Sequence, residues 1–240
     1  MRALVVALVL ASAGAAHAQA QFAVDRTRID LTDAGPTGAL TITNHGHAAL
    51  RLSLAAFSWH DDIDGAMQLQ PTTDIVVRPA LIEIAPGTSR VVRIGTTVRP
   101  GSAEASFRVF AEELPSRVPE ASNTIAVRTR VGIPVFVAPR GSASIGALSP
   151  VVALDGGKAV VTVQGVGALH AKLATITVKA IANGKVRWSH DVGGWYVLPG
   201  QTRRFPVALG TDSCAGADQL VAEIVGEDNT RWLGPPLRCH

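Results

Sequence analysis

The stretch "NTIAVRTRVGIPVFVAP" at residues 123–139 decides the fold. One series of alternate residues is almost wholly apolar: Ile125, Val127, Thr129, Val131, Ile133, Val135 and Val137. The other series carries two arginines and Pro134. A period of two predicts a β-strand with one apolar face. This strand exceeds the usual ~3–10 residues, and its proline indicates an edge or a strand end. A long apolar edge promotes aggregation, so its presence calls for a functional reason.

The first 20 residues are typical of a secretory signal peptide. Arg2 precedes an apolar run that ends in small residues, and "AHA" at 16–18 or "AQA" at 18–20 offers a cleavage site. The run is too short for the ~20 apolar residues of a membrane anchor. We therefore expect an exported chain with no membrane span in its mature part.

Charge and cysteine content narrow the function classes further. The formal net charge is +3 and no basic run occurs, so we expect no nucleic-acid partner. The chain has two cysteines, Cys214 and Cys239. In an exported protein two cysteines most simply form one disulfide, the alternative being two free thiols.

Period-two runs bounded by turn residues dominate the rest of the chain, and helical stripes are scarce. The segment 140–150 is small and polar, as interdomain linkers are. Hairpin signals such as "NG" at 183–184 occur on its C-terminal side. The pattern predicts an all-β protein with two immunoglobulin-like β-sandwich domains, at 21–140 and 141–240.

Signals for enzymatic chemistry are weak. No G-x-S-x-G, H-E-x-x-H or P-loop motif occurs. "HDDIDG" at 60–65 has oxygen-rich side chains but lacks the glutamate of a calcium loop, so we interpret it as a solvated hairpin turn. A Ser-His-Asp triad assembled by folding stays an alternative. We expect no enzyme activity, no cofactor and no metal.

The chain resembles the periplasmic chaperones of bacterial pili, a PapD-like family. The motifs that carry the resemblance are "DRTR" (25–28), "PGTSRVVRI" (86–94), "FRVFAEELP" (107–115), the 123–139 strand and, weakly, "GED" (226–228). "FSWHDD" (57–62) and "RVGIPVFVAP" (130–139) look more like the archaic branch, which serves spore-coat-U-like and Csu-type pilins. The resemblance implies a strand lent to an incomplete pilin sandwich, a form of β-strand addition. The lent residues are then Ile125, Val127, Thr129 and Val131. The alternative is that they form an ordinary core.

The resemblance also implies a pair of basic residues that grip the C-terminal carboxylate of the pilin. The first matches Arg28, whereas Gly132 stands where the family usually has a lysine. Arg130 is our substitute, unless this branch anchors the subunit differently. A buried charge cluster that links the domains is implied for Arg93, Glu104 and either Glu227 or Asp228.

The sequence therefore predicts a periplasmic chaperone that uses no ATP and folds and caps pilus or spore-coat-U-type subunits. We expect it to deliver them to an outer-membrane usher, and to self-associate through the 123–139 strand when free. The rival hypothesis is a secreted immunoglobulin-like adhesin or structural protein.

Overall fold

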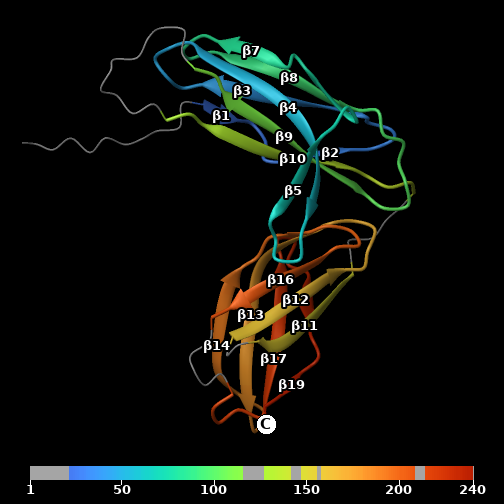
Figure 1. Ribbon diagram of the computed structural model, residues 1–240, viewed down its shortest axis with the longest axis vertical. Helices are drawn as coiled ribbons and strands as arrows, with labels where there is room; N and C mark the ends of the chain where they lie inside the picture. The colour runs from blue at the N-terminus through green and yellow to red at the C-terminus, as the bar shows by residue number, and fades with distance from the viewer. Residues whose placement is uncertain (1–21, 116–126, 142–146, 156–157, 209–213, 240) are drawn as a thin grey trace, which may run out of the picture.

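The computed structural model describes residues 22–115, 127–141, 147–155, 158–208 and 214–239. The signal peptide predicted at 1–20 lies outside these ranges. Two β-sandwiches follow one another along the chain and meet at an angle (Figure 1). Within the described ranges no helix is long and apolar enough to cross a membrane. The predicted all-β fold with two immunoglobulin-like domains is confirmed.

The first sandwich packs a sheet of order β1-β3-β8-β6 on a sheet of order β2-β10-β9-β4-β5, with β7 added beside β4. Its strands are β1 (Phe22–Val24), β2 (Ile29–Leu31), β3 (Thr37–Asn44), β4 (Leu50–Asp61), β5 (Met67–Pro71), β6 (Ile75–Arg78), β7 (Leu81–Ile84), β8 (Ser89–Thr96), β9 (Ala105–Glu113) and β10 (Arg130–Val137). Alternate residues of facing strands fill the core, among them Ile42, Ile94 and Val109. This is how a period of two produces a sandwich.

The second sandwich packs a sheet of order β11-β12-β16 on a sheet of order β14-β13-β17-β18, where β15 pairs with β13 and β19 with β17. Its strands are β11 (Leu148–Asp155), β12 (Lys158–Gly165), β13 (Ala171–Ala182), β14 (Lys185–Gly193), β15 (Tyr196–Val197), β16 (Thr202–Val207), β17 (Gln219–Gly226), β18 (Arg231–Leu233) and β19 (Leu237–Arg238). Asn183 and Gly184 both have positive φ and turn β13 into β14, as their sequence predicted.

The predicted disulfide between Cys214 and Cys239 is present. The two cysteines are 25 residues apart in the sequence, and both side chains pack against the apolar core of the second sandwich. The bond joins the segment before β17 to the residue after β19, so it ties down the C-terminal end of the described chain.

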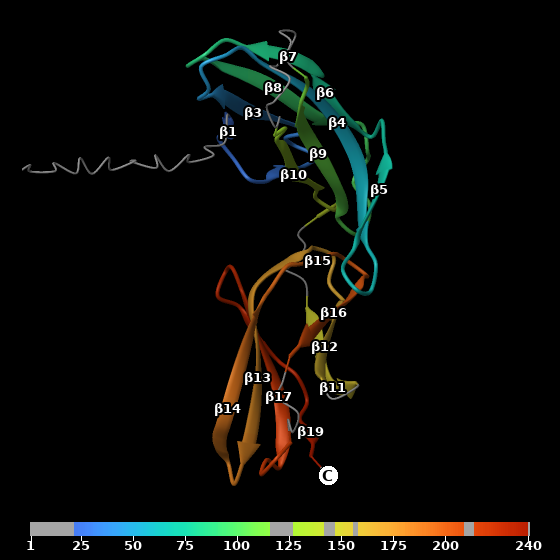
Figure 2. The ribbon, with the colours of Figure 1, turned by 60° about the vertical axis from the view of Figure 1, so that its left-hand side comes forward.

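The β4–β5 hairpin joins the two sandwiches, and "HDDIDG" is the hairpin turn that the sequence predicted. His60, Asp62, Ile63 and Asp64 are exposed, as expected of a solvated turn, but Asp61 is not. Both ribbon views show this hairpin reaching β16 (Figures 1 and 2). Asp61 Oδ2 accepts a hydrogen bond from Arg203 Nη1 at 2.8 Å, and the Ile63 carbonyl accepts one from the Arg204 amide at 2.7 Å. The Asp61 side chain is only 4 % exposed, because the second domain covers it.

Aromatic side chains fill the rest of the junction. Trp59 and Phe136 from the first domain pack with Tyr196 and Leu198 from the second. The His170 ring stacks on Phe136 with a centroid distance of 3.7 Å. Phe136 belongs to the residues of β10 that point away from its own core, so this contact explains why both faces of β10 are buried at its C-terminal end.

Candidate functional site: a free strand edge and an interdomain pocket

The edge of β10 that faces away from β9 is only partly covered. β9 pairs with β10 along the whole of Arg130–Val137. On the other side, β2 pairs only with Val135–Val137. From Val127 to Pro134 the second edge therefore has no strand partner within the ranges that the structure describes.

Two hydrogen bonds define which main-chain groups face this free edge. The Thr129 carbonyl accepts from the Glu113 amide of β9 at 3.0 Å, and the Ala138 amide donates to the Leu31 carbonyl of β2 at 2.8 Å. Because main-chain groups alternate in direction along a strand, even-numbered residues present theirs to the free edge. The N–H that Pro134 lacks is thus missing from the edge rather than from the β9 ladder, where it would be more disruptive.

The side chains of β10 resolve the parity that the sequence left open. Ile133, Val135 and Val137 lie in the core of the first sandwich, and half-buried Val131 packs against that core. The odd-numbered residues therefore face inward over Val131–Val137. Val127, two positions before Thr129, is 76 % exposed. Ile125 lies outside the described residues, so its predicted role has no structural test.

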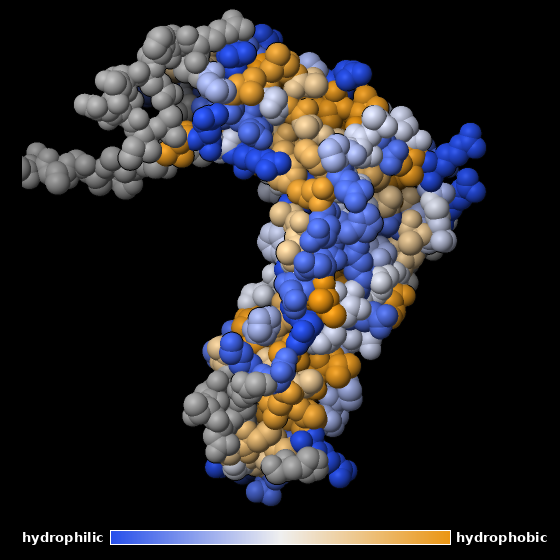
Figure 3. Space-filling view, in the orientation of Figure 1, coloured by the Kyte–Doolittle hydropathy of each residue, from blue (hydrophilic) through white to orange (hydrophobic). Residues whose placement is uncertain are grey.

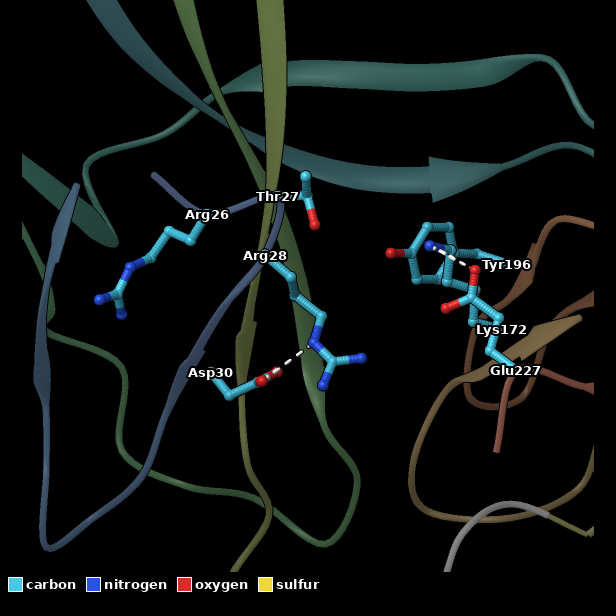
Figure 4. A pocket seen from close by; sticks show the side chains of 7 residues that line it. All are labelled: Arg26, Thr27, Arg28, Asp30, Lys172, Tyr196 and Glu227. Carbon is cyan, nitrogen blue, oxygen red and sulfur yellow. Dashed lines mark hydrogen bonds and ion pairs between the residues drawn. The ribbon is translucent and has the colours of Figure 1, made fainter. Parts of the chain in front are cut away.

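A pocket of about 420 Å³ lies between the domains, close to the start of β2. Arg26, Thr27, Arg28 and Asp30 line it from the first domain, and Lys172, Tyr196 and Glu227 from the second. Figure 4 shows the Arg28 side chain and the Tyr196 hydroxyl on opposite sides of the space between the two domains. The space-filling view shows the bent outline of the molecule, with its open concave side between the domains (Figure 3).

The charged groups of this pocket are paired but solvated. Arg28 Nε lies 2.9 Å from Asp30 Oδ2, and Lys172 Nζ lies 2.7 Å from Glu227 Oε1. The Glu227 carboxylate raises the pKa of Lys172 above its usual value, so the ammonium stays charged. The lining holds three cations and two carboxylates, and this excess of positive charge favours an anionic ligand.

Arg130, our substitute for the usual lysine, does not line the pocket. Its guanidinium lies 3.9 Å from the centre of the Phe110 ring and 3.5 Å from the Glu112 carboxylate. The same ring explains Gly132, because a Cβ there would lie 2.7 Å from Phe110 Cε1. Of the two arginines that we expected to act together, only Arg28 lines this pocket.

The cluster predicted for Arg93, Glu104 and Glu227 is not formed within the described chain. Arg93 is exposed on β8, because its neighbours Val92 and Ile94 take the core-facing positions. Glu104 instead contacts His170 of the second domain, with 2.6 Å between Oε1 and Nδ1. Glu227 pairs with Lys172, as described above.

A buried cation that the sequence did not reveal lies at the domain junction. Arg108 on β9 is 6 % exposed, and its guanidinium carbon lies 4.1 Å from the centre of the Trp59 ring. Burial lowers the pKa of this side chain. No group of three or more His, Cys, Asp or Glu side chains is placed to hold a metal ion in the part of the chain that the structure covers.

Two immunoglobulin-like sandwiches joined at an angle define a class of solved structures that this chain resembles. A chain of the CsuC–CsuE chaperone–tip adhesion subunit pre-assembly complex, from the archaic Csu pili of Acinetobacter baumannii, matches with a TM-score of 0.64 and 19% identity, covering 89% of this chain and 97% of that one. The YadV chaperone matches with a TM-score of 0.62 and 16% identity over 91% and 100% of the two chains. The Salmonella enterica complex of SafA pilin with the SafB chaperone gives 0.56 and 14% over 91% and 95%.

The sequence itself identifies the family. Residues 21–143 match the family described as pili and flagellar-assembly chaperone, PapD N-terminal domain. The chain belongs to this family, as its resemblance predicted. No curated protein sequence matches it.

Proposed function

We propose that this protein is a periplasmic chaperone that holds pilin or spore-coat-U-type subunits on the free edge of β10 and delivers them to an outer-membrane usher. The observation that carries the proposal is the position of that edge, which runs from Val127 to Pro134 and ends beside Arg28. Its main-chain groups are free to pair, and β-strand addition uses such groups for affinity. Exposed Val127 and half-buried Thr129 and Val131 supply the side-chain contacts, because Ile133 and the odd-numbered residues after it lie in the core of the chaperone.

The position of Arg28 sets the direction of the added strand. Ile29 pairs with Val135 in parallel, so Arg28 stands where the covered part of β10 gives way to the free part. A subunit strand that ends at Arg28 and follows the free edge then runs parallel to β10. Its terminal carboxylate meets the guanidinium in a charge-assisted contact.

The subunit chain and a second copy of the chaperone compete for the same edge in this proposal. An unpaired apolar edge is a template for other strands. We therefore propose self-association through 123–139 as the resting state that a subunit displaces.

Hydrogen exchange tests the proposal with an internal control. The chaperone is co-expressed in the periplasm with a pilin or spore-coat-U-type subunit of the same bacterium, and the complex is purified. The amides of Arg130 and Gly132 face the free edge, so we expect the subunit to slow their exchange. The amides of Val131 and Ile133 face β9 and should be protected with or without the subunit. Failure to form a complex, or unchanged exchange at Arg130 and Gly132, contradicts the proposal.

Arg28→Ala is the matching test of the carboxylate contact. Removing one member of a charge pair that becomes buried costs roughly 2–5 kcal/mol, so we expect capture of the subunit to be lost or greatly weakened. The fold should survive, because the Arg28 side chain is 45 % exposed in the free protein. Arg26→Ala, which removes another cation of the same pocket, serves as the control for net charge. Unchanged affinity of Arg28→Ala would remove this residue from the site.

A further inference from the structure

Two buried arginines lie beside the Asp61 carboxylate at the domain junction. Arg203 of the second domain bonds it directly, and its side chain is 16 % exposed. Arg108 of the first domain is buried as well. Burial lowers the pKa of Arg108, and Tyr196 and Asp61 oppose this effect only in part. Two buried positive charges therefore share one negative charge here, and a buried charge without a partner is costly.

Three nitrogen atoms of these arginines have no hydrogen-bond acceptor in the described chain. They are Arg108 Nε, Arg108 Nη2 and Arg203 Nε, and all three are buried. The guanidinium carbon of Arg108 lies 4.1 Å from the centre of the Trp59 ring and 5.9 Å from that of Trp195. These cation–π contacts stabilise the charge, but they do not replace the acceptors that guanidinium N–H groups require. The polar groups of the junction are thus incompletely paired, which disfavours this arrangement.

Arg108 is placed to reach Asp61 within the first domain. Phe57, Trp59 and Asp61 alternate along one face of β4. Arg108 is the cross-strand partner of Phe57, so its side chain lies on the same face. Its guanidinium already lies over Trp59, whose indole N–H donates to Asp61 at 2.7 Å. The Arg108 side chain therefore extends along β4 toward the carboxylate, and rotation about its side-chain bonds can bring the two groups together.

A second polar contact between the domains has no such deficit. The Glu104 amide donates to the Ala168 carbonyl at 2.8 Å, and Glu104 Oε1 lies 3.2 Å from the His170 amide nitrogen and 2.6 Å from its Nδ1. The His170 ring stacks on Phe136 of β10. Because β9 lies between β10 and β4 in the sheet, this contact and the Asp61 ion pair hold different parts of the junction. The Glu104–His170 contact suits a hinge, and the ion pair suits a latch.

We propose that Asp61 exchanges between Arg203 and Arg108 and thereby sets the angle between the two domains. In the closed arrangement, which Figures 1 and 2 show, Asp61 binds Arg203 of the second domain. In the tilted arrangement Asp61 binds Arg108, Arg203 is hydrated, and the second domain turns about the Glu104–His170 contact away from the β4–β5 hairpin. The aromatic contacts of the junction favour the closed arrangement, whereas the three unpaired nitrogen atoms favour the tilted one. This inference goes beyond the proposed function, because it concerns the free protein and needs no subunit.

The exchange predicts opposite effects for two substitutions that each remove one buried arginine. Arg108→Met removes the competitor for Asp61, so only the closed arrangement should remain. Its urea midpoint should rise above that of the wild type, because replacing an unsatisfied buried cation by an apolar side chain is often stabilising. Arg203→Met removes the partner of the closed arrangement, so Asp61 should pair with Arg108 and the tilted arrangement should dominate. If both arginines served only to pack the junction, the two changes would act in the same direction.

The angle is measured as the distance between two nitroxide spin labels, one on each domain of the full chain. Gln70→Cys on β5 and Ser149→Cys on β11 provide the attachment points, since both positions are exposed. Cys214 and Cys239 are joined in the disulfide and do not compete for the label. An excess of unlabelled protein prevents distances between copies from being recorded. Pulsed dipolar EPR should show a shorter and a longer distance in the wild type, the shorter alone in Arg108→Met, and mainly the longer in Arg203→Met.

Arg204→Met is the matched control. Arg204 follows Arg203 on β16, but its ion pairs with Asp64 and Asp155 lie at the surface, so this variant should give the wild-type distances. A single wild-type distance that Arg108→Met leaves unchanged overturns the proposal, and so does a wild-type distribution in Arg203→Met. Failure of Arg203→Met to fold would mean that Arg108 does not take over Asp61, which overturns it as well. A urea midpoint of Arg108→Met below that of the wild type would contradict the cost assigned to the unpaired Arg108 nitrogens.

Discussion

Asp61 on β4 and Arg203 on β16 form a buried ion pair, 2.8 Å from Oδ2 to Nη1, that joins the two sandwiches. The Trp59 indole N–H donates to the other Asp61 oxygen at 2.7 Å. One carboxylate thus accepts a hydrogen bond from each domain. The pair also explains Gly65, because the Arg203 guanidinium lies 2.4 Å from where a Cβ would stand.

Asp61→Ala should destabilise the junction strongly. The change leaves the Arg203 charge and the Trp59 N–H buried without a partner, and breaking a buried pair in this way costs about 3–5 kcal/mol. Urea unfolding followed by tryptophan fluorescence measures the loss, because Trp59 lies in the junction. Asp64→Ala is the control, since its side chain is 75 % exposed and lies 3.8 Å from Arg204. Equal stability of the two variants would contradict a structural role for the Asp61 pair.

Gly132→Lys should destabilise the first domain rather than supply a second anchor. The new Cβ would meet the Phe110 ring at 2.7 Å, and overpacking of this kind costs about 1–3 kcal/mol. Adding Phe110→Ala should remove the clash, so the effects of the two changes on the free energy of unfolding should not add. Thermal unfolding of the two single variants and the double variant tests this. Additive effects would show that Phe110 does not exclude a side chain at this position.

Local signals predicted much of the fold. The alternation in 130–137 predicted β10 because a period of two is set by strand geometry alone. Asn183 and Gly184 predicted their hairpin because the turn needs positive φ at both positions. The disulfide was predicted because an exported chain with two cysteines has one simple way to pair them.

The candidate site was harder to predict, because its members come from both domains. Arg28 was identified from the "DRTR" motif, but Lys172 lines the same pocket only after the sandwiches meet, and no local pattern marks it. The sequence predicted a solvated turn at Asp61 and its neighbours. A run of charged residues does not reveal whether one of its carboxylates is hydrated or, like that of Asp61, bound to an arginine of the other domain. Arg93 was assigned to the charge cluster only from the family resemblance, and the sequence does not reveal which side of β8 faces the core because Val91 and Val92 are both apolar.

Glu223 on β17 should give the second domain an acid-sensitive part of its stability. Lys179 and then Arg231 lower the pKa of this carboxyl by hydrogen bonding and by charge. A lowered folded pKa means that the contribution is present above the unfolded value of 4.5 and is lost as pH falls through the folded pKa. Glu223→Gln should therefore be less stable than the wild type at about pH 7, and the difference should narrow below about pH 4.5. Urea midpoints at several pH values test this, and a difference independent of pH would contradict it.

A substitution at Val127 distinguishes between the two roles that the sequence allowed for the odd-numbered residues of the strand, namely lent strand and ordinary core. Its side chain is 76 % exposed, so Val127→Asp has little packing to lose and should change the free energy of unfolding by about 0.5 kcal/mol or less. The same carboxylate, buried without a partner in an apolar subunit, should block capture. Thermal unfolding and co-purification with the subunit measure the two effects side by side.

Two further valine substitutions serve as comparisons for Val127→Asp, one on the same face of the strand and one in the second domain. Val131 packs against the core of the first sandwich, so Val131→Asp places a charge at the core and should lower both stability and capture. Val151→Asp, at an exposed position on β11 of the second domain, should change neither. Near-native stability of Val127→Asp with capture retained would exclude Val127 from the lent strand. A loss of several kcal/mol would instead mean that Val127 is core, and that the free edge begins further along β10.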